Sequence, residues 1–133
     1  DGVADINLSN LYNHHINAKT MATVTAVTPP GRFGALTLDD NNFVKEFQEK
    51  PDTDGTINGG FFVLHPEALD LVRDDQTIWE REPLETLAAT HQLNAYRHNG
   101  FWHPMDTMRD RLYLDDLWHK NKAPWKLWNE GEA

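Results

Sequence analysis

The stretch MATVTAV, residues 21–27, combines β-branched side chains with a complete absence of charge. This composition is typical of a strand buried within a sheet. The segment before it, residues 6–18, carries side chains at the spacing of one helix face: Leu8, Leu11, Tyr12 and His15. Asp5 precedes that segment and is a suitable N-cap. The chain is therefore predicted to begin with a helix that leads into a buried strand.

Four more strands are predicted further along the chain. Residues 35–38 and 43–48 flank the polar turn at residues 39–42 and predict a hairpin. Residues 57–64, INGGFFVL, and residues 93–98, LNAYRH, predict two separate strands because both are rich in aromatic or β-branched side chains.

Three further helices are predicted. Pro66 and Pro83 are each placed to open a short helix. Residues 107–121 predict a final helix, which Thr107 and Asp110 cap in a T-x-x-D pattern. Its apolar residues lie on two sides, Met108 and Leu112 on one and Tyr113, Leu114, Leu117 and Trp118 on the other. Such a helix packs against more than one layer, which includes the option of a second subunit. The order of elements predicts a mixed α/β or α+β sheet.

Composition narrows the function. The 133 residues fit one domain, and no apolar run approaches the roughly 20 residues of a membrane span. A net charge of −9 argues against nucleic acid or anionic lipid as a partner. The chain has no cysteine, which excludes disulfides and thiolate metal sites and fits a cytoplasmic protein. Because it opens on Asp1 rather than Met, we expect a processed product, an engineered fragment or a piece of something longer.

Two loops carry charge suited to an anionic ligand. Glu49 and Lys50, fixed by Pro51, follow a predicted strand directly, and open α/β sheets bind ligands beyond strand ends. From composition alone, a solvated turn is the simpler interpretation. Arg32 lies in a glycine-containing loop, residues 31–34, whose backbone amides can face an anion.

Two glycines interrupt an otherwise strong strand. Gly59 and Gly60 weaken the predicted strand 57–64, so their presence needs a reason. One reason is the close approach of a ligand or of another backbone. The other is a β-bulge, and the residues themselves favour neither.

Asp106, in FWHPMDT, is a carboxylate among bulky apolar residues. Helix capping is its simplest role, but Thr107 is an equally good cap. Mg²⁺ is typically bound by one or two carboxylates together with substrate phosphates, so a metal role requires a second acid elsewhere in the chain.

Other catalytic constellations are not supported by the sequence. His14 and His15 are adjacent on a helix and point about 100° apart, which disfavours zinc chelation. His15 and His91 lie on apolar stripes and are most simply core or interface histidines. Ser9, the only serine, lacks the context of a hydrolase nucleophile.

The chain resembles a known family. The runs PPGRFGAL, FQEKP, INGGFFVL, WEREPLETLA, GFWHPMDTMRD and KAPWKLW follow one another in the order found in the C-terminal half of the glucose-1-phosphate cytidylyltransferases. These are sugar-nucleotide pyrophosphorylases of the nucleotidyltransferase superfamily. The resemblance covers residues 1–128 and leaves a tail, residues 129–133, without a motif. It implies a Rossmann-like mixed sheet flanked by helices.

The resemblance also implies an activity and its partners. The family transfers a cytidylyl group from CTP to glucose 1-phosphate, with Mg²⁺, and releases CDP-glucose and pyrophosphate. Nucleotidyl transfer relies on positioning and charge neutralisation, so no side-chain nucleophile is required. A cytoplasmic homo-oligomer is expected, because half a doubly wound sheet exposes strand edges.

Individual residues match the family's motifs. Asp1 and Asp106 match its two metal-binding aspartates. Lys50 matches the residue that meets the sugar phosphate, and Glu49 the one that binds sugar hydroxyls. Gly34 and Gly59 match glycines that let the sugar ring approach the backbone.

One family segment is missing. The sequence contains no glycine-rich LAGGxGTRL-type loop, which holds the triphosphate in this family. We therefore expect this chain alone to be inactive. A non-catalytic sugar-phosphate binding or assembly module is one alternative, and a related pyrophosphorylase using UTP or dTTP is another.

Overall fold

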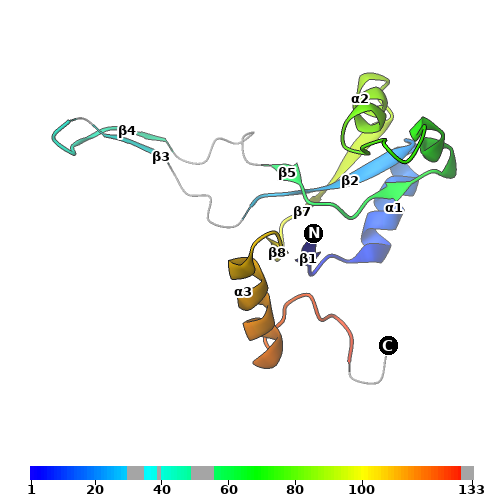
Figure 1. Ribbon diagram of the computed structural model, residues 1–133. Helices are drawn as coiled ribbons and strands as arrows, with labels where there is room; N and C mark the ends of the chain where they lie inside the picture. Colours follow the sequence, from blue (N-terminus) through cyan, green and yellow to red (C-terminus); the bar gives the residue numbers. More distant parts are fainter. Residues whose placement is uncertain (30–34, 39, 49–55, 130–133) are drawn as a thin grey trace.

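The computed structural model describes residues 1–29, 35–38, 40–48 and 56–129 (Figure 1). Its centre is strand β2 (Ala22–Val27), which the uncharged stretch predicted. Strand β7 (Leu93–His98) pairs with β2 in parallel, whereas β5 (Ile57–Asn58) and β6 (Val63–Leu64) pair with it antiparallel. The sheet is therefore mixed, as predicted.

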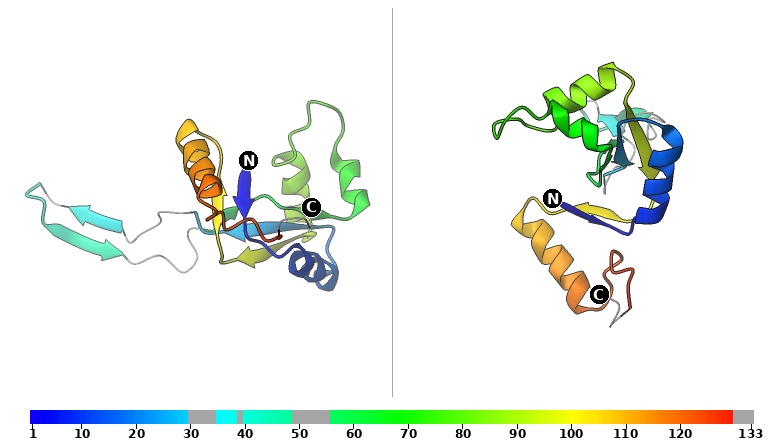
Figure 2. Two further views of the ribbon diagram at one scale, coloured as in Figure 1. Left: turned by 90° about the horizontal axis from the view of Figure 1, so that it is seen from below. Right: turned by 90° about the vertical axis from the view of Figure 1, so that its right-hand side faces the viewer.

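Helices cover both faces of this sheet. Helix α1 (Leu8–Ala18) lies on one side, and the 3-10 helix η1 (Pro66–Leu71) with helix α2 (Glu82–Ala89) lies on the other (Figure 2). Adjacent strand residues point to opposite faces. Accordingly, Val63 packs with the α1 cluster around Leu11, and Leu64 packs with the α2 cluster around Leu87. This is the layered α/β arrangement that was expected.

The first helix begins later than predicted. Its N-cap is Asn7, whose side chain accepts a hydrogen bond from the backbone of Asn10 at 3.0 Å. Asp5 is not the cap, because it still belongs to the extended segment before the helix: its backbone nitrogen donates to the carbonyl of Phe101 at 3.1 Å. That bond extends an antiparallel ladder and keeps the chain out of helical geometry up to Asn7.

The predicted strand 57–64 is in fact two short strands separated by a bulge. Asn58 pairs with Ala26 and Val63 with Thr23, so residues 59–62 face only two residues of β2. Gly60 has a φ of +77°, which glycine adopts without steric cost. The β-bulge interpretation of the two glycines is confirmed.

A two-stranded ribbon was not predicted. Strand β1 (Gly2–Ala4) pairs antiparallel with β8 (Trp102–Pro104), in the register Gly2 with Pro104 and Ala4 with Trp102. Each strand has three residues, too few to show an alternating pattern. The ribbon joins the start of the described chain to the segment before the last helix.

The last helix, α3 (Met108–His119), has the predicted capping box: Thr107 Oγ1 accepts from the Asp110 backbone, and Asp110 Oδ2 accepts from the Thr107 backbone. One of its apolar sides packs within this chain, through buried Leu114. The other, Met108 and Leu112, is 64% and 61% exposed.

Two other predictions have different outcomes. The hairpin is confirmed as β3 (Ala35–Leu38) and β4 (Val44–Gln48), which project away from the sheet in Figure 1. His91 is exposed, with a φ of 56°, because α2 ends at Ala89, so His91 is not a core histidine; its place at an interface stays a prediction. In the described part of the chain, no helix is long and apolar enough to cross a membrane.

Candidate functional site

The ribbon brings the two predicted metal aspartates together. Beyond the last paired residues, the Met105 backbone nitrogen donates to the carbonyl of Asp1 at 2.7 Å. Asp106 follows directly, and its Oδ1 lies 3.5 Å from the amino nitrogen of Asp1. The two side chains are 88% and 67% exposed, so both carboxylates are open to solvent. Asp1 and Asp106 thus lie together at one end of the ribbon.

Both aspartates line one cleft of about 340 Å³. Gly59, the third predicted site residue that the structure describes, lines the same cleft. The remaining lining comes from the ribbon, from the bulge region and from the loop before α2: Gly2, Trp102 and Pro104; Ile57, Asn58, Gly60 and Phe62; and Glu80. Three residues that the family resemblance names therefore line one cleft, and their roles stay predictions.

Gly59 has an internal reason to be glycine. A Cβ built on it would lie 2.7 and 2.9 Å from the two methyl carbons of Val27. Real Cβ atoms essentially never lie this close to another heavy atom. Gly59 is buried, and its backbone nitrogen donates to the carbonyl of Thr25 at 2.8 Å. Close approach of a neighbouring strand thus accounts for this glycine, besides the sugar contact that the resemblance implies.

The cleft contains two candidate ligands for a divalent cation. Among the residues that the structure describes, no three His, Asp or Glu side chains gather closely enough to hold a metal ion. Asp1 and Asp106 supply two exposed carboxylates in a common cleft. This donor set fits Mg²⁺, which retains water and takes its remaining oxygens from phosphates.

The capping box leaves the Asp106 carboxylate unused by the helix. Asp110 Oδ2 accepts from the backbone nitrogens of Asp106 and Thr107, at 3.1 and 3.2 Å. The hydrogen bond from the Asp106 backbone is the main reason that the pKa of Asp110 is lowered from its usual value, and hydrogen bonds from Thr107 lower it further. Thr107, not Asp106, is the cap, so the two capping alternatives are resolved.

The remaining predicted site residues, Arg32, Gly34, Glu49 and Lys50, lie outside the described residues. Sequence reasoning in turn assigned no role to Glu80, Phe62 or Trp102, which line the cleft. Only Trp102 had a signal, its place in FWHPMDT close to Asp106. Glu80 reaches the cleft from a loop whose course depends on packing, including the edge-to-face contact of Trp79 with Phe62 at 6.0 Å.

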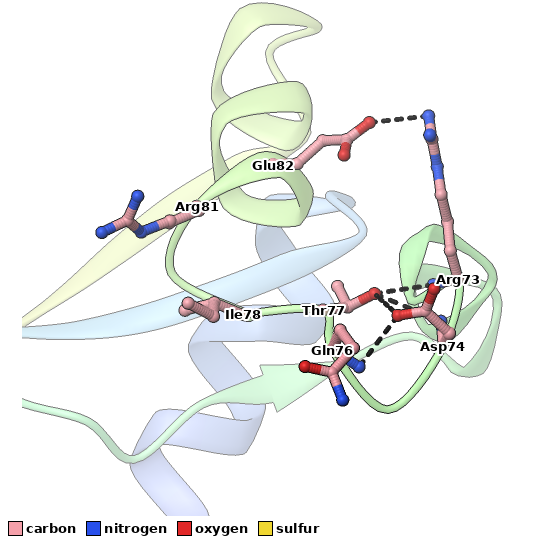
Figure 3. Close-up of a pocket in the computed structure, with 7 residues that line it drawn as sticks. All are labelled: Arg73, Asp74, Gln76, Thr77, Ile78, Arg81 and Glu82. Atoms are coloured by element: carbon pink, nitrogen blue, oxygen red, sulfur yellow. Dashed lines mark hydrogen bonds and ion pairs between the residues drawn. The ribbon is translucent and has the colours of Figure 1, made fainter.

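A separate cavity of about 390 Å³ lies beside the start of α2 (Figure 3). Arg73 pairs with Glu82 across it at 2.7 Å, and Asp74 accepts a hydrogen bond from the Gln76 backbone. None of the described site residues predicted from sequence lines this cavity. Its charged groups serve to fix the loop between η1 and α2.

The histidines have structural contacts. His15 is buried under α1, and its Nδ1 lies 2.8 Å from Thr23 Oγ1, which confirms the core prediction. Burial is the main cause of its lowered pKa, with smaller contributions from His65 and His14. His98 Nε2 lies 3.0 Å from the carbonyl oxygen of Phe101, which connects the end of the ribbon to β7.

Comparisons with known proteins point to one enzyme family. The family model of nucleotidyl transferases matches residues 1–116. The chain is 54% identical to a glucose-1-phosphate cytidylyltransferase of Salmonella typhi and 43% identical to a "probable glucose-1-phosphate cytidylyltransferase" of Bacillus subtilis. Each match covers 96% of this chain and 50% of the relative. The chain therefore spans about half the length of these curated relatives.

A more distant relative and a solved structure also match this chain. A "probable mannose-1-phosphate guanylyltransferase 1" of Oryza sativa is 34% identical over 96% of this chain and 37% of its own length. A crystal structure of a Bacillus anthracis protein assigned as a glucose-1-phosphate thymidylyltransferase superposes with a TM-score of 0.58. That match covers 99% of this chain and 54% of the other, at 15% identity, and so supports the fold alone.

Proposed function

The chain belongs to the nucleotidyl transferase family, and from that premise we propose that it is the sugar-phosphate and metal-binding part of a glucose-1-phosphate cytidylyltransferase. The proposed reaction joins CTP to glucose 1-phosphate and releases CDP-glucose and pyrophosphate. One observation carries the proposal: Asp1, Asp106 and Gly59 line a single cleft.

The residues of this cleft suit binding and orientation rather than covalent catalysis. The phosphate oxygen of glucose 1-phosphate attacks the α-phosphorus of CTP, and pyrophosphate leaves. Asp1 and Asp106 would hold a Mg²⁺ ion, which neutralises the charge of the phosphates when bound. Lys50, Glu49, Arg32 and Gly34 are proposed to hold the sugar phosphate, on the strength of their motifs.

The choice of CTP rests on similarity. The cytidylyltransferases are more similar to this chain than the guanylyltransferase is, at 54% and 43% against 34% identity. UTP or dTTP remains the alternative, because this comparison rests on overall identity and not on a residue that contacts the base.

Calorimetry and product analysis test the proposal together. We expect the 133-residue chain to bind glucose 1-phosphate in the presence of Mg²⁺ and, since it contains no glycine-rich loop, to form no CDP-glucose from CTP. Binding of galactose 1-phosphate serves as the specificity control. A chain that binds neither metal nor sugar phosphate contradicts the proposal.

The same measurements separate a second class of function. A non-catalytic sugar-phosphate binding module is the second candidate, because the two exposed carboxylates of the cleft can take part in metal binding without any turnover. An enzyme of full family length that contains these residues should turn over CTP. It should also lose turnover when Asp106 is replaced by Ala, whereas a binding module shows no turnover at any length.

A further inference from the structure

The candidate cleft has two walls that belong to different sheets. One wall is the ribbon of β1 and β8, which carries Asp1 and Asp106. The other is the bulge after β5, which carries Gly59 and belongs to the main sheet around β2. A metal-bound sugar phosphate that touches both walls needs them at a fixed separation, because productive geometry tolerates little displacement.

One hydrogen bond spans this cleft directly. The indole Nε1 of Trp102, on β8, donates to the carbonyl oxygen of Gly59 at 3.0 Å. Trp102 is half-buried, and its ring also packs against the cluster of Ala4, Ile6 and Leu11. The bond therefore starts from a side chain that is anchored in the core on the ribbon side.

The bulge leaves the Gly59 carbonyl available for this bond. The Gly59 nitrogen donates to Thr25, while the Thr25 nitrogen donates to the carbonyl of Gly60 rather than to that of Gly59. The Gly59 carbonyl is consequently not used by β2 in this part of the ladder. A buried carbonyl requires a partner, and Trp102 supplies one.

A glycine on the ribbon gives the indole room. Gly2 lies diagonally across from Trp102, since Gly2 pairs with Pro104 and Ala4 with Trp102. A Cβ on Gly2 would approach Trp102 Nε1 to 3.2 Å, so a side chain there would press on the donor atom itself. The sequence Asp1-Gly2 thus combines a metal aspartate with the space that the bridging indole needs.

We propose that Trp102 is a positioning residue: its indole N–H fixes the aspartate ribbon to the sugar-contacting glycine and thereby couples metal binding to sugar-phosphate binding. This inference rests on the proposed function. It assigns Trp102 no contact with the reacting atoms. Loss of the indole N–H should therefore weaken the effect that the sugar phosphate and the metal ion have on each other's binding. The affinity of the ribbon for the metal ion alone, and of the bulge for the sugar phosphate alone, should change less.

The test compares Trp102→Phe with wild type in the 133-residue chain. Phenylalanine keeps an aromatic ring in the core and removes only the donor. Gly2→Ala is a second variant, which retains Trp102 but crowds its Nε1. Trp118→Phe is the matched control, because Trp118 lies on α3 and lines no part of this cleft. Circular dichroism establishes that each variant is folded.

The first readout needs no ligand. Hydrogen exchange of the Met105 amide, which bonds Asp1, reports opening of the ribbon. We expect this amide to exchange roughly three- to tenfold faster in Trp102→Phe and Gly2→Ala, which corresponds to the loss of one hydrogen bond. Amides of the β2–β7 ladder and the Trp118→Phe protein should be unchanged. An unchanged Met105 amide in both cleft variants overturns the proposal, whatever the ligands do.

The second readout is ligand coupling. Mn²⁺ affinity is measured by calorimetry with and without glucose 1-phosphate. We expect glucose 1-phosphate to tighten Mn²⁺ binding in wild type and Trp118→Phe, and this enhancement to fall roughly three- to tenfold in Trp102→Phe, with the affinity for Mn²⁺ alone retained. Equal enhancement in all proteins overturns the positioning role. A wild type that binds no Mn²⁺ contradicts the proposed function itself and the positioning role with it.

Discussion

Oδ1 of Asp106 lies 3.5 Å from the amino nitrogen of Asp1, although the two residues are far apart in the sequence. Backbone pairing accounts for this proximity: the β1–β8 ladder continues through the bond from Met105 to the Asp1 carbonyl. The contact between the Asp106 carboxylate and the amino group of Asp1 contributes little, since ion pairs exposed to solvent are weak. A backbone ribbon can therefore present two carboxylates to solvent without their having to stabilise the fold.

Asp106→Asn should remove metal binding with little effect on stability. The substitution keeps the side-chain shape and removes the charge, and Thr107 and Asp110 still cap α3. We expect Mn²⁺ binding, measured by calorimetry, to be lost and the urea midpoint to be nearly unchanged. Asp115→Asn, on the exposed side of α3, is the control and should bind Mn²⁺ as wild type does. Retained Mn²⁺ affinity in Asp106→Asn would remove Asp106 from the metal site.

Thr107→Ala should show the converse behaviour. It removes the oxygen that accepts from the Asp110 backbone at 3.1 Å. Loss of an N-cap typically costs about 1 kcal/mol of stability. We expect that decrease in the free energy of unfolding, measured by urea titration, with Mn²⁺ affinity retained. If the free energy of unfolding does not change, the capping box contributes nothing to the stability of the chain.

Local signals in the sequence predicted much of the fold. The uncharged stretch that forms β2, the hairpin β3–β4 and the cap at Thr107 depend on neighbouring residues, and all three were predicted. The ribbon was not, because its strands are three residues long and pair across almost the whole chain. Asp5 was misassigned as a helix cap for the same reason, since its backbone bonds Phe101.

The composition of the candidate cleft was predicted only in part. The family resemblance named Asp1, Asp106 and Gly59, and the structure places these three residues in one cleft, while their roles stay predictions. Glu80 carried no sequence signal, because its entry into the cleft depends on how the loop before α2 packs. From the residue types alone, either a β-bulge or the close approach of a ligand or another backbone could explain the two glycines. The structure shows both, with the bulge at residues 59–62 and Val27 against Gly59.

The two glycines should respond differently to alanine. In Gly59→Ala the new Cβ meets Val27, which is 2% exposed and enclosed, so we expect a loss of about 1–3 kcal/mol from overpacking. In Gly60→Ala there is nothing within 4 Å of the new Cβ, but the φ of +77° costs about 1–2 kcal/mol.

A double-mutant cycle separates these causes. Val27→Ala removes the methyl carbons that meet Gly59, so Gly59→Ala should cost less in that background, whereas Gly60→Ala should cost the same. The free energies come from urea unfolding. Equal costs of Gly59→Ala in both backgrounds would show that Val27 is not the reason for this glycine.

Self-association stays a prediction, and α3 provides a test. Met108 and Leu112 are one turn apart and are 64% and 61% exposed. If this side of α3 contacts a second copy, Leu112→Lys should shift the sedimentation profile toward monomer. Arg109→Ala, on the same helix, is the control for a general effect of altering the helix surface. A wild-type chain that sediments as a monomer at all concentrations contradicts the prediction.

The pH dependence of stability should contain a contribution from His15. Burial lowers the pKa of this imidazole from its usual 6.5, so the unfolded chain takes up a proton more readily than the folded one. Above pH 6.5 the imidazole of His15 is neutral in both states and does not lower the stability. As the pH drops below 6.5 toward the folded pKa, the unfolded chain binds the proton first, so the free energy of unfolding should fall. His15→Gln, which keeps a polar group near Thr23, should reduce this loss, whereas His119→Gln on exposed α3 should not. Urea titrations at several pH values measure the effect. If His15→Gln and wild type show the same pH profile, a group other than His15 causes the loss of stability. That group is not Asp110, because the lowered pKa of Asp110 affects stability only at more acidic pH, below 3.8.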